Sequence, residues 1–563
     1  MKTPFKAFRA ALVVVAFCMA AAPAPARAAG RPKALMVMVD GMRADAVENM
    51  RLPALQALRE GRWQPGYNGF STLTAHTIRD ARPSSAANHA AIATGVTAGK
   101  TKVYKNGDTP KGDFASWPSW MARVADARPG TKALYAYSWK GDMMLAPHPK
   151  VVNLPITSVV SNNWPVSGRY AANARTMPEI MSRADAPDAT LYFIDIGDWG
   201  GHRSGFYPYG GEYLLDIQLA DRIIGETLDA IASRPTFKDE DWLVMVTSDH
   251  GGYGKSHGIW GGHATTIPVI VASRHVPQGR IAGMPCNCDL APTALAHFGL
   301  DVGKMQLDGK PVVDRAEDRG QPLANGLAAY FTFDEASPVN RAGGAVAARL
   351  HGKTVSGARG GRFGGCLEIA ADKDGACGAS LAGSEKLAFE GGTCFTMTLW
   401  VRMDAPQEKQ APIVSNKNWE SGANPGFVLV GARMTDAVKR PGVCFNCALD
   451  GEARRLDMGT FDIDYGLWCF YAVTRDECGV LTVYQGGKDG VLYWIADDAA
   501  KIKLETGLPF WIGQDGTGRC KVSFTGAVDD FALWTRALPR ADIRRIYGSR
   551  SNGICGILNR PPE

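Results

Sequence analysis

The sequence predicts an α/β domain with a doubly wound, mostly parallel sheet, followed by an all-β sandwich. Over residues 33–298, apolar runs of strand length alternate with helical segments, as in a parallel sheet covered on both faces. Residues 327–548 instead carry short β-like runs broken by glycine turns, which is typical of a sandwich. The 563 residues are too many for one hydrophobic core, so two or three domains are expected.

The expected elements of the first domain follow from hydrophobic periodicity. Residues 33–39 are apolar without alternation, which indicates a strand buried on both faces. A long amphipathic helix is expected from Glu212 to Ser233. The other expected strands are 132–138, 190–196, 242–247 and 266–272, and the other expected helices are 53–60, 171–183 and 290–298. Acidic residues follow some of these strands, where doubly wound sheets place their ligand sites.

The N-terminus has the three regions of a secretory signal peptide. Lys2, Lys6 and Arg9 form a positive region, residues 10–22 are apolar, and Ala26-Arg27-Ala28 fits a cleavage site. The apolar run is too short to span a membrane comfortably, and we see no other run of 18 apolar residues. We therefore expect an exported protein, periplasmic or extracellular, without a membrane span.

Composition places the domain boundaries and excludes some functions. A signal peptide is expected at 1–28, the α/β domain at 29–315, a Pro- and Gly-containing linker at 316–326, the sandwich at 327–550 and a tail at 551–563. The composition is 45% hydrophobic and 21% charged, as in ordinary globular proteins. The net charge of +6 is mild, and no motif for binding nucleic acid is found.

Cysteines are concentrated in the sandwich region. Twelve are present, and nine lie after residue 360. In an exported protein this clustering favours disulfides. Removal of the signal peptide would take Cys18 and leave an odd number, so at least one thiol is expected to stay unpaired within the chain. Cys444 and Cys447 have the CxxC spacing of a zinc knuckle but lack a second such pair, so disulfides or free thiols are favoured.

A serine-containing stretch at residues 82–95 is the first candidate for chemistry. It reads as a loop ending at Pro83, followed by a helix entered through Ser84 or Ser85 and lined by alanines. A serine at this position is usually a helix cap. The same position favours anions through its free N–H groups and the helix dipole, so the serine could also be a nucleophile facing a phosphate. Metal ligands elsewhere in the chain would decide between the two roles.

Candidate metal ligands follow the expected strands. Asp40 ends the first apolar run, and Asp249 and His250 end another. The other candidates are Asp198 and His202 in Asp-Trp-Gly-Gly-His, and His257 in Ser-His-Gly. Each has an ordinary alternative as a turn residue or a core histidine, but together and in this order they form a specific signal.

With the serine stretch, these motifs resemble the alkaline phosphatase superfamily, and within it the nucleotide pyrophosphatase/phosphodiesterase-like branch. The shared marks are Asp-Gly after the first strand, Ser three residues before Asn-His, Asp-x-x-x-His, Ser-Asp-His-Gly and a later His-Gly. The resemblance covers about residues 33–310. Residues 327–548 resemble the laminin G-like, concanavalin A-like jelly-roll module, through an opening Phe-Thr-Phe-Asp and a closing Gly-x-x-Asp-Asp.

The superfamily resemblance implies two divalent metal ions. It assigns Asp40, Asp249 and His250, with the oxygen of Ser85, to one ion; Asp198, His202 and His257 would hold the other. Mixed Asp and His ligands suit Zn²⁺, with Mn²⁺ as the alternative. The step to Asn88-His89, which we interpret as structural residues of the helix, selects Ser85 over Ser84 as nucleophile. His263 competes with His257, and the spacing from His257 to Pro268 favours His257.

Two further residues are implied with less support. The resemblance places Asn106, 21 positions after Ser85, on a phosphoryl oxygen, whereas Asn before Gly is also a common turn. Lys140 occupies the lysine position of a Lys-x-Arg motif of monoesterases, but Asp142 stands where the arginine would be. This departure mildly favours diesters, and a solvated loop lysine is the alternative.

The predicted function is an exported two-metal phosphoric ester hydrolase of the phosphodiesterase/nucleotide pyrophosphatase type, acting through a phosphoseryl intermediate on a small-molecule or glycan-linked phosphate ester. A phosphomonoesterase is the first alternative. A sulfatase ranks lower because Ser84-Ser85-Ala86-Ala87 lacks the [CS]-x-P-x-R motif. A non-catalytic glycan-binding protein is the alternative from another class. The sandwich is expected to bind glycan or to pack on the catalytic domain. Asp529-Asp530 would form a solvated turn or, less favoured, a Ca²⁺ site.

Overall fold

The structure, a computed structural model, describes residues 30–558 with some gaps. The gaps are 143–144, 157–165, 208–210, 259–261, 316–320, 373–374, 388–393, 408–409, 434–440, 450–453, 461–462, 478, 488–489, 498–501 and 551. The predicted signal peptide lies outside the described residues. Among the helices that are described, none has the length and apolar character needed to cross a membrane.

An eight-stranded sheet forms the centre of the N-terminal domain. Its order is β4 (Val151–Pro155), β3 (Ala133–Tyr137), β5 (Ala189–Ile194), β1 (Arg31–Val39), β6 (Glu240–Thr247), β7 (Thr266–Ser273), β2 (Asn68–His76) and β8 (Gly279–Arg280). The pairs β3–β4, β3–β5, β1–β5, β1–β6 and β2–β8 are parallel, whereas β7 runs antiparallel to β6 and β2. The predicted mostly parallel sheet is therefore confirmed.

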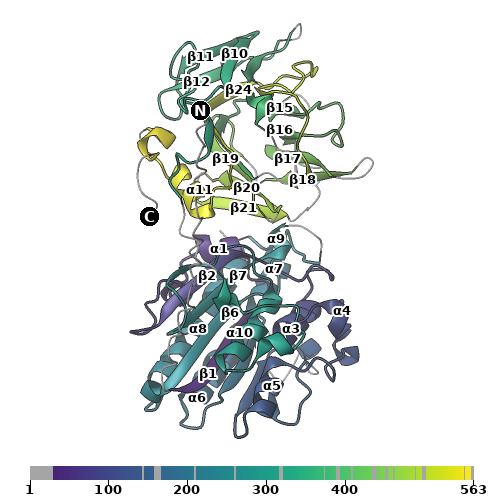
Figure 1. Cartoon of the computed structure of the whole chain (residues 1–563), viewed down its shortest axis with the longest axis vertical. Coiled ribbons are helices and arrows are strands. Elements are labelled where there is room, and N and C mark those ends of the chain that lie inside the picture. Colours follow the sequence, from purple (N-terminus) through teal and green to yellow (C-terminus); the bar gives the residue numbers. More distant parts are fainter. Residues whose placement is uncertain are drawn as a thin grey trace, which may run out of the picture.

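Helices cover both faces of this sheet, as Figure 1 shows. Alternate residues of β1 point to opposite sides: Leu35 and Val37 pack with α2 (Pro53–Arg59), α6 (Val166–Ser182) and α8 (Gly211–Ala232). Ala34 and Met36 pack with α3 (Ser85–Thr94), α5 (Trp120–Ala127) and α10 (Leu290–His297). Shorter helices are α1 (Ala44–Asn49), α4 (Ala98–Thr101), α7 (Ile196–Ser204) and α9 (Gly262–Thr265). Burial on both faces explains the continuous apolar run of β1.

The C-terminal domain is a sandwich of two sheets. One sheet has the order β10 (Ala347–His351), β13 (Gly378–Ala382), β23 (Phe510–Ile512), β15 (Ala411–Ser415), β16 (Phe427–Arg433), β17 (Pro441–Leu449) and β18 (Arg455–Gly459), with β22 (Ile502–Lys503) on β17. The other has β11 (Thr354–Arg359), β12 (Gly365–Ile369), β24 (Gly526–Trp534), β14 (Phe395–Arg402), β19 (Trp468–Arg475), β20 (Leu481–Gly486) and β21 (Leu492–Asp497), with β9 (Leu327–Phe331) on β24. A core that includes Leu399, Phe427 and Phe445 lies between them.

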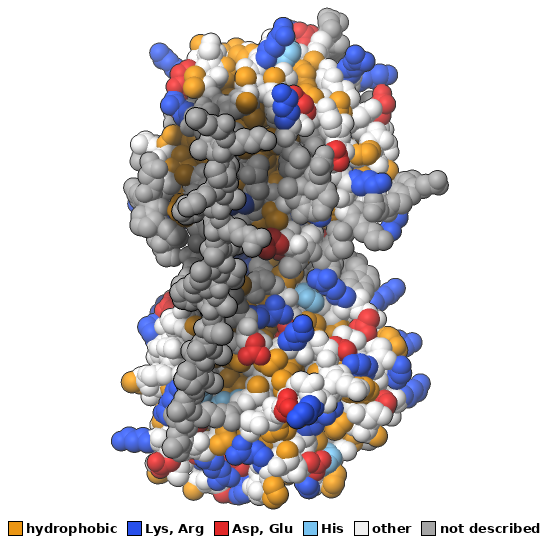
Figure 2. Space-filling view, viewed as in Figure 1, with side chains coloured by type: hydrophobic (Ala, Val, Ile, Leu, Met, Phe, Trp, Pro, Cys, Tyr) orange, Lys and Arg blue, Asp and Glu red, His pale blue; other side chains and the backbone are white. Residues whose placement is uncertain are grey.

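Among the described residues, the two domains touch where the edge strand of the sandwich meets short helices of the N-terminal domain. Figure 1 shows β21 and the helix α11 (Arg540–Tyr547) facing α1 and α9 of the N-terminal domain. On the face drawn in Figure 2, basic and acidic side chains are interspersed on both lobes, in keeping with the mild net charge of +6.

The structure corrects the expectation of disulfides in the sandwich. The ten described cysteines are all free thiols, so none of the predicted disulfides forms among them. Cys444 and Cys447 cannot pair because they lie three positions apart on β17 and face opposite sides: Cys447 points into the core, while Cys444 packs with Val428 and Val430 in a separate cluster.

The prediction of a solvated turn at Asp529-Asp530 is wrong. Both side chains are buried within β24. All four of their carboxylate oxygens accept hydrogen bonds, from the backbone N–H groups of Phe363, Asp530 and Ile554 and from the hydroxyl of Tyr330. The two carboxylates therefore connect neighbouring segments to β24. Because all four of their oxygens already accept hydrogen bonds, a Ca²⁺ site is not favoured here.

Candidate active site

The candidate ligands come together at the carboxyl ends of three adjacent strands. Asp40 directly follows β1, and Asp249 and His250 lie just beyond β6. Asp198 lies on α7, which begins two residues after β5. Because β5, β1 and β6 are neighbours and run parallel, their following segments meet at one edge of the sheet.

Ser85 is the first residue of α3 and points toward this cluster. Its hydroxyl oxygen Oγ lies 3.2 Å from Nε2 of His250, and the side chain is buried. Ser84 precedes it in extended conformation at the N-cap position but makes no capping hydrogen bond, and its Oγ has no hydrogen-bond partner among the described residues. Of the two serines, Ser85 therefore faces the chemistry-bearing side chains, and neither acts as a helix cap.

Asp40, Asp249 and His250 form the part of the site nearest to Ser85. Nε2 of His250 lies 3.4 Å from Oδ1 of Asp40 and 3.2 Å from Oδ2 of Asp249. Oδ1 of Asp249 accepts a hydrogen bond from the backbone N–H of Gly41, which fixes the two loops to each other. Gly41 has φ +68°, and a Cβ at this position would lie 3.0 Å from Cα of Asp198, so a side chain would strain the turn and crowd α7.

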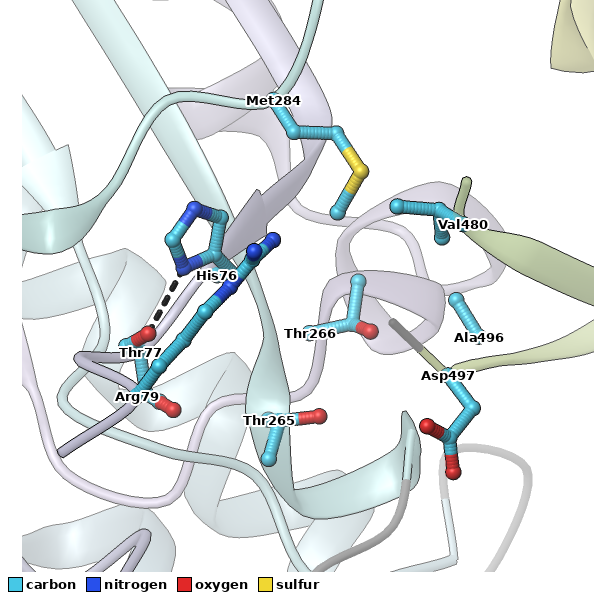
Figure 3. A pocket seen from close by; sticks show the side chains of 9 residues that line it. All are labelled: His76, Thr77, Arg79, Thr265, Thr266, Met284, Val480, Ala496 and Asp497. Carbon is cyan, nitrogen blue, oxygen red and sulfur yellow. Dashed lines mark hydrogen bonds between the residues drawn. The ribbon is translucent and has the colours of Figure 1, made fainter. Parts of the chain in front are cut away.

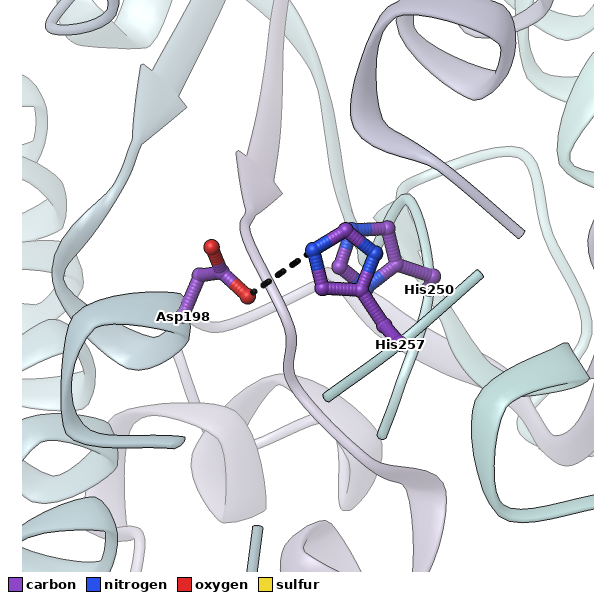
Figure 4. Close-up of side chains that lie close together, drawn as sticks. All are labelled: Asp198, His250 and His257. Atoms are coloured by element: carbon purple, nitrogen blue, oxygen red, sulfur yellow. Dashed lines mark ion pairs between the residues drawn. The ribbon is translucent and has the colours of Figure 1, made fainter. Parts of the chain in front are cut away.

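Asp198, His202 and His257 lie beside this group, and Figure 4 shows Asp198 and His257 next to His250. Oδ2 of Asp198 is 3.2 Å from Nε2 of His202, one helical turn further along α7. Oδ1 of Asp198 is 3.8 Å from Nε2 of His257, whose ring stacks on His250 with centroids 3.9 Å apart. The donor atoms of Asp198, His250 and His257 fall within 4.8 Å of one another. His250 thus lies between the two predicted ligand groups and can reach either.

The pairing of His89 with Asp142 was not foreseen from the sequence. Both side chains are fully buried, and Nδ1 of His89 lies 2.9 Å from each carboxylate oxygen of Asp142. Nε2 of the same ring lies 3.0 Å from Oδ2 of Asp249. His89 therefore links a residue of the helix α3 to a candidate ligand, and Asp142 holds the ring in place. The sequence signal was present in Asn88-His89, but the partner 53 residues away was not recognisable.

Charge on the His89 ring decides its role. Burial lowers the pKa of His89, but the carboxylates of Asp142 and Asp249 outweigh this and raise it to about 10. A protonated imidazole donates from both nitrogens and has no lone pair for a metal ion. Although its donor atom groups with those of Asp40 and Asp249, His89 acts as a hydrogen-bond donor that orients Asp249.

The residues present fit a divalent metal ion in each group. Oδ1 of Asp40 and Oδ1 of Asp198 are buried and accept no hydrogen bond from the described residues. Buried carboxylate oxygens without partners are costly, and a cation bound by them removes that cost. Each of these oxygens has imidazole nitrogens beside it, and a mixed set of carboxylates and imidazoles suits Zn²⁺.

The pKa shifts show how closely the charges are packed. Burial and the carboxylates of Asp249 and Asp198 raise the pKa of Asp40 well above its usual range. Burial would also raise that of Asp249, but His250 and His89 together place its pKa below its usual range. The hydrogen bond to Asp198 raises the pKa of His202 to about 9. Several carboxylates with opposing shifts in one buried cluster are typical of functional sites.

The remaining predicted residues are placed as follows. Asn106 is exposed, and its side-chain oxygen accepts a hydrogen bond from the backbone N–H of Ala86 at the start of α3, 3.0 Å away. Asn106 therefore lies next to Ser85, and its contact with a phosphoryl oxygen stays a prediction. Lys140 begins a short 3-10 turn, and its side chain lies outside the described part of the chain.

His263, the rival of His257, lies in a different environment. Its Nδ1 is 2.8 Å from Nη2 of Arg43, and its ring stacks on Tyr253. Burial and the neighbouring Arg43 lower its pKa well below the usual value. The geometry thus places His257, not His263, beside Asp198.

Two family models match separate parts of the chain. Residues 34–254 match the family model of type I phosphodiesterase / nucleotide pyrophosphatase, and residues 377–544 match that of the concanavalin A-like lectin/glucanases superfamily. No curated protein matches the sequence.

Similar solved structures include several hydrolases at low identity. A 2-O GAG sulfatase is 13% identical with a TM-score of 0.40, covering 60% of this chain and 82% of that one. An alkaline phosphatase superfamily protein from Vibrio parahaemolyticus is 14% identical with a TM-score of 0.38, and the match covers 52% of this chain and 71% of that one. Murine ectonucleotide pyrophosphatase/phosphodiesterase 5 is 14% identical with a TM-score of 0.35, covering 48% and 96%.

Proposed function

Because residues 34–254 belong to the type I phosphodiesterase / nucleotide pyrophosphatase family, we propose that the chain is a metal-dependent phosphodiesterase that uses Ser85 as its nucleophile. The family supports an ester hydrolase; the diester substrate, the two metal ions and the covalent intermediate are the parts that we propose. We further propose that the protein is exported, as its N-terminal sequence predicts.

One observation carries the proposal. The hydroxyl of Ser85 lies 3.2 Å from His250, at the junction of two groups that each contain a buried carboxylate oxygen without a hydrogen-bond partner among the described residues. A serine that served only the fold would not need such surroundings, whereas a nucleophile that must lose its proton would. The competing role as a helix cap is unsupported, because Ser84 and not Ser85 occupies the N-cap position, and the Ser84 side chain makes no capping hydrogen bond.

Asp40, Asp249 and His250 would hold one divalent ion and Asp198, His202 and His257 the other, with His250 able to contact both. Bound there, the ions would lower the pKa of the Ser85 hydroxyl and neutralise charge that develops on phosphate oxygens. His89 and Asp142 keep the carboxylate of Asp249 in a fixed orientation from behind. His257 is held by Pro83, whose carbonyl lies 3.2 Å from its Nδ1, so the ring is tied to the loop that precedes the nucleophile.

The proposed reaction has two chemical steps. In the first, the Ser85 hydroxyl loses its proton to solvent and Oγ forms a bond to phosphorus while the bond to the leaving oxygen breaks; that oxygen departs and takes up a proton from solvent. In the second, water attacks the phosphoseryl phosphorus and loses a proton to solvent, the bond to Oγ breaks, and Oγ takes up a proton that restores the Ser85 hydroxyl. The N-terminus of α3 would stabilise the anionic phosphoryl group through its N–H groups and dipole. We propose that the amide nitrogen of Asn106, whose oxygen accepts the N–H of Ala86, adds a hydrogen bond.

A phosphodiester fits the charges better than a monoester does. Asp142 occupies the position where monoesterases carry an arginine, and its carboxylate is fully buried against His89. This position therefore supplies no positive charge for the second negative charge of a monoester. We propose a small-molecule or glycan-linked diester as substrate, and a phosphomonoester as the second candidate.

Hydrolysis of matched p-nitrophenyl esters tests the proposal. The zinc-loaded protein should cleave bis(p-nitrophenyl) phosphate faster than p-nitrophenyl phosphate and should not cleave the sulfate. Ser85→Ala and Asp249→Ala should both abolish the diesterase activity, whereas Ser84→Ala should retain it. Faster cleavage of the monoester would replace the proposed substrate class but keep the nucleophile. Wild-type activity in Ser85→Ala would refute the mechanism.

A further inference from the structure

The sandwich contacts the catalytic domain next to the segments that carry the ligands. Its edge strand β21 lies against α1 and α9. α1 begins four residues after Asp40, and α9 begins five residues after His257. At this boundary, Ala496 and Asp497 of the sandwich line a crevice together with Thr265 and Thr266, as Figure 3 shows.

A buried ionic cluster holds the α1 side of this contact. The carboxylate of Glu48 accepts a hydrogen bond from the indole N–H of Trp494 at 3.1 Å and pairs with Arg540 at 3.1 Å. The guanidinium of Arg540 also lies over the Trp494 ring, 4.6 Å from its centroid. Asn49 donates to the backbone carbonyl of Leu492. Glu48 has only 7% of its side chain exposed, so these contacts are protected from solvent.

On the α9 side, the backbones of the two domains touch directly. A Cβ built on Gly262 would lie 1.7 Å from the backbone oxygen and 2.3 Å from the backbone nitrogen of Ala496. Gly262 does not have a positive φ, so its backbone would accept alanine without strain. A glycine is needed at position 262 because a side chain would collide with Ala496 of the sandwich, and not because the local backbone conformation requires glycine.

The next residue, His263, connects this contact to the ligand-bearing loops through Arg43. Nδ1 of His263 accepts a hydrogen bond from Nη2 of Arg43, because a guanidinium can only donate. The remaining donors of Arg43 bind the carboxylate of Asp45 and the backbone carbonyls of Phe206, at 2.7 Å, and Gly252, at 3.3 Å.

All five N–H groups of Arg43 are therefore used, and the side chain is 1% exposed. Phe206 follows the helix that carries Asp198 and His202, Gly252 follows His250, and Arg43 itself follows Asp40. One guanidinium thus joins the three loops, and none of its bonds described above goes to the six metal-ligand candidates that the site brings together.

From this chain of contacts we infer that the β-sandwich is a structural part of the catalytic unit, which holds the ligand loops in position through Gly262, His263 and Arg43. Arg43 is the positioning residue of this arrangement. Only the description of the N-terminal domain as catalytic rests on the proposed function, because the contacts between the domains do not depend on which reaction is catalysed.

Gly262→Ala in the full-length protein tests the inference. A real Cβ would have to move the sandwich or the 262–265 segment by more than 1 Å, and displacements of about 1 Å can cost about 100-fold in rate. We expect zinc affinity, measured by competition with a chromophoric chelator, to fall about 10-fold or more. Amide hydrogen exchange of residues 248–257 should accelerate. Gly225→Ala is the matched control, because its Cβ would meet only Ala54 at an ordinary 3.4 Å.

A second pair of variants covers the case in which Gly262→Ala does not fold. Glu48→Gln removes the charge from the interface cluster, whereas Glu60→Gln makes the same change at an exposed residue that pairs with Arg62. Faster amide hydrogen exchange of residues 248–257 in Glu48→Gln, but not in Glu60→Gln, would support the inference.

Unchanged exchange and zinc affinity in both Gly262→Ala and Glu48→Gln would overturn it. Hydrogen exchange needs neither substrate nor metal, so it tests the role of the sandwich even if no ester is hydrolysed.

Discussion

The imidazole of His89 lies 3.0 Å from the carboxylate of Asp249, with the opposite ring nitrogen against Asp142. The pair turns Asp249, a candidate ligand, into a carboxylate whose orientation is fixed from two sides, because its other oxygen accepts from Gly41. Outer partners of this kind commonly decide metal affinity as much as the ligands do.

His89→Gln should weaken zinc binding by about 10- to 100-fold while leaving the fold intact, because the ligand Asp249 loses its donor. Asp142→Asn should act in the same direction. His275→Gln is the matched control, since His275 pairs with Asp241 at the amino end of β6, away from the site. Zinc content after dialysis against graded chelator measures the effect. If zinc binding is unchanged and only thermal stability falls, the pair is purely structural.

Ser85, and not Ser84, should carry the covalent intermediate. Acid quenching during turnover of bis(p-nitrophenyl) phosphate, followed by peptide mass spectrometry, should find the transferred phosphoryl group with its remaining ester on Ser85. Ser84→Ala should form the adduct like the wild type, because the Ser84 hydroxyl has no hydrogen-bond partner among the residues that the structure describes. An adduct on Ser84, or an adduct that survives in Ser85→Ala, would contradict the assignment.

Asn106 accepts the backbone N–H of Ala86, and substitution can test whether it also has the proposed role of binding phosphate. Asn106→Ala should lower kcat by about 100-fold if its amide nitrogen binds a phosphoryl oxygen, the usual cost of one such donor. Asn106→Asp retains an oxygen for the Ala86 N–H but loses the donor, so it should be as impaired as the alanine variant. Steady-state kinetics with the diester decide the matter. Full activity in Asn106→Asp would show that the residue only completes the turn.

Asp216 should make stability depend on pH. Burial raises its pKa to about 7, although Arg203 partly counteracts this. The folded state therefore disfavours the ionised form, and stability is lost as pH rises from about 4, the usual value in an unfolded chain, to 7.

Asp216→Asn removes this cost. Above pH 7 the variant should be more stable by about 4 kcal/mol, since the pKa lies about 3 units above its usual value and each unit is worth about 1.4 kcal/mol. At pH 4 the wild type and the variant should have similar free energies of unfolding. Urea unfolding at pH 4, 6 and 8 measures the difference, and a difference that does not grow with pH would contradict the shift.

The sequence predicted the central strands well because burial on both faces leaves an unmistakable apolar run, as in β1 and β6. It missed β2, whose residues Asn68–His76 mix small polar and apolar side chains. That strand owes its conformation to pairing with β7, a contact between segments nearly 200 residues apart that local pattern does not reveal.

For the site, short motifs identified side chains that lie together at one sheet edge, but not how they interact. The sequence analysis noted Asp142 only because it stands where monoesterases carry an arginine. Its pairing with the buried His89 is visible only in the three-dimensional structure. The same holds for Asp529 and Asp530, whose hydrogen-bond partners come from distant segments. Arg43 gave no sequence signal beyond its proximity to Asp40, because two of its partners are backbone carbonyls and a third, His263, is 220 residues away in the sequence.

The placement of Asp198 and His202 one turn apart on α7 limits how this region can vary in length. Each residue of an α-helix turns the chain by about 100°, so one inserted residue between them would rotate His202 away from Asp198. The loop from Gly252 to Ser256 is under no such periodic constraint. Across related proteins, we therefore expect insertions and deletions to be absent from the five-residue interval 198–202 and to collect in segments outside the helix.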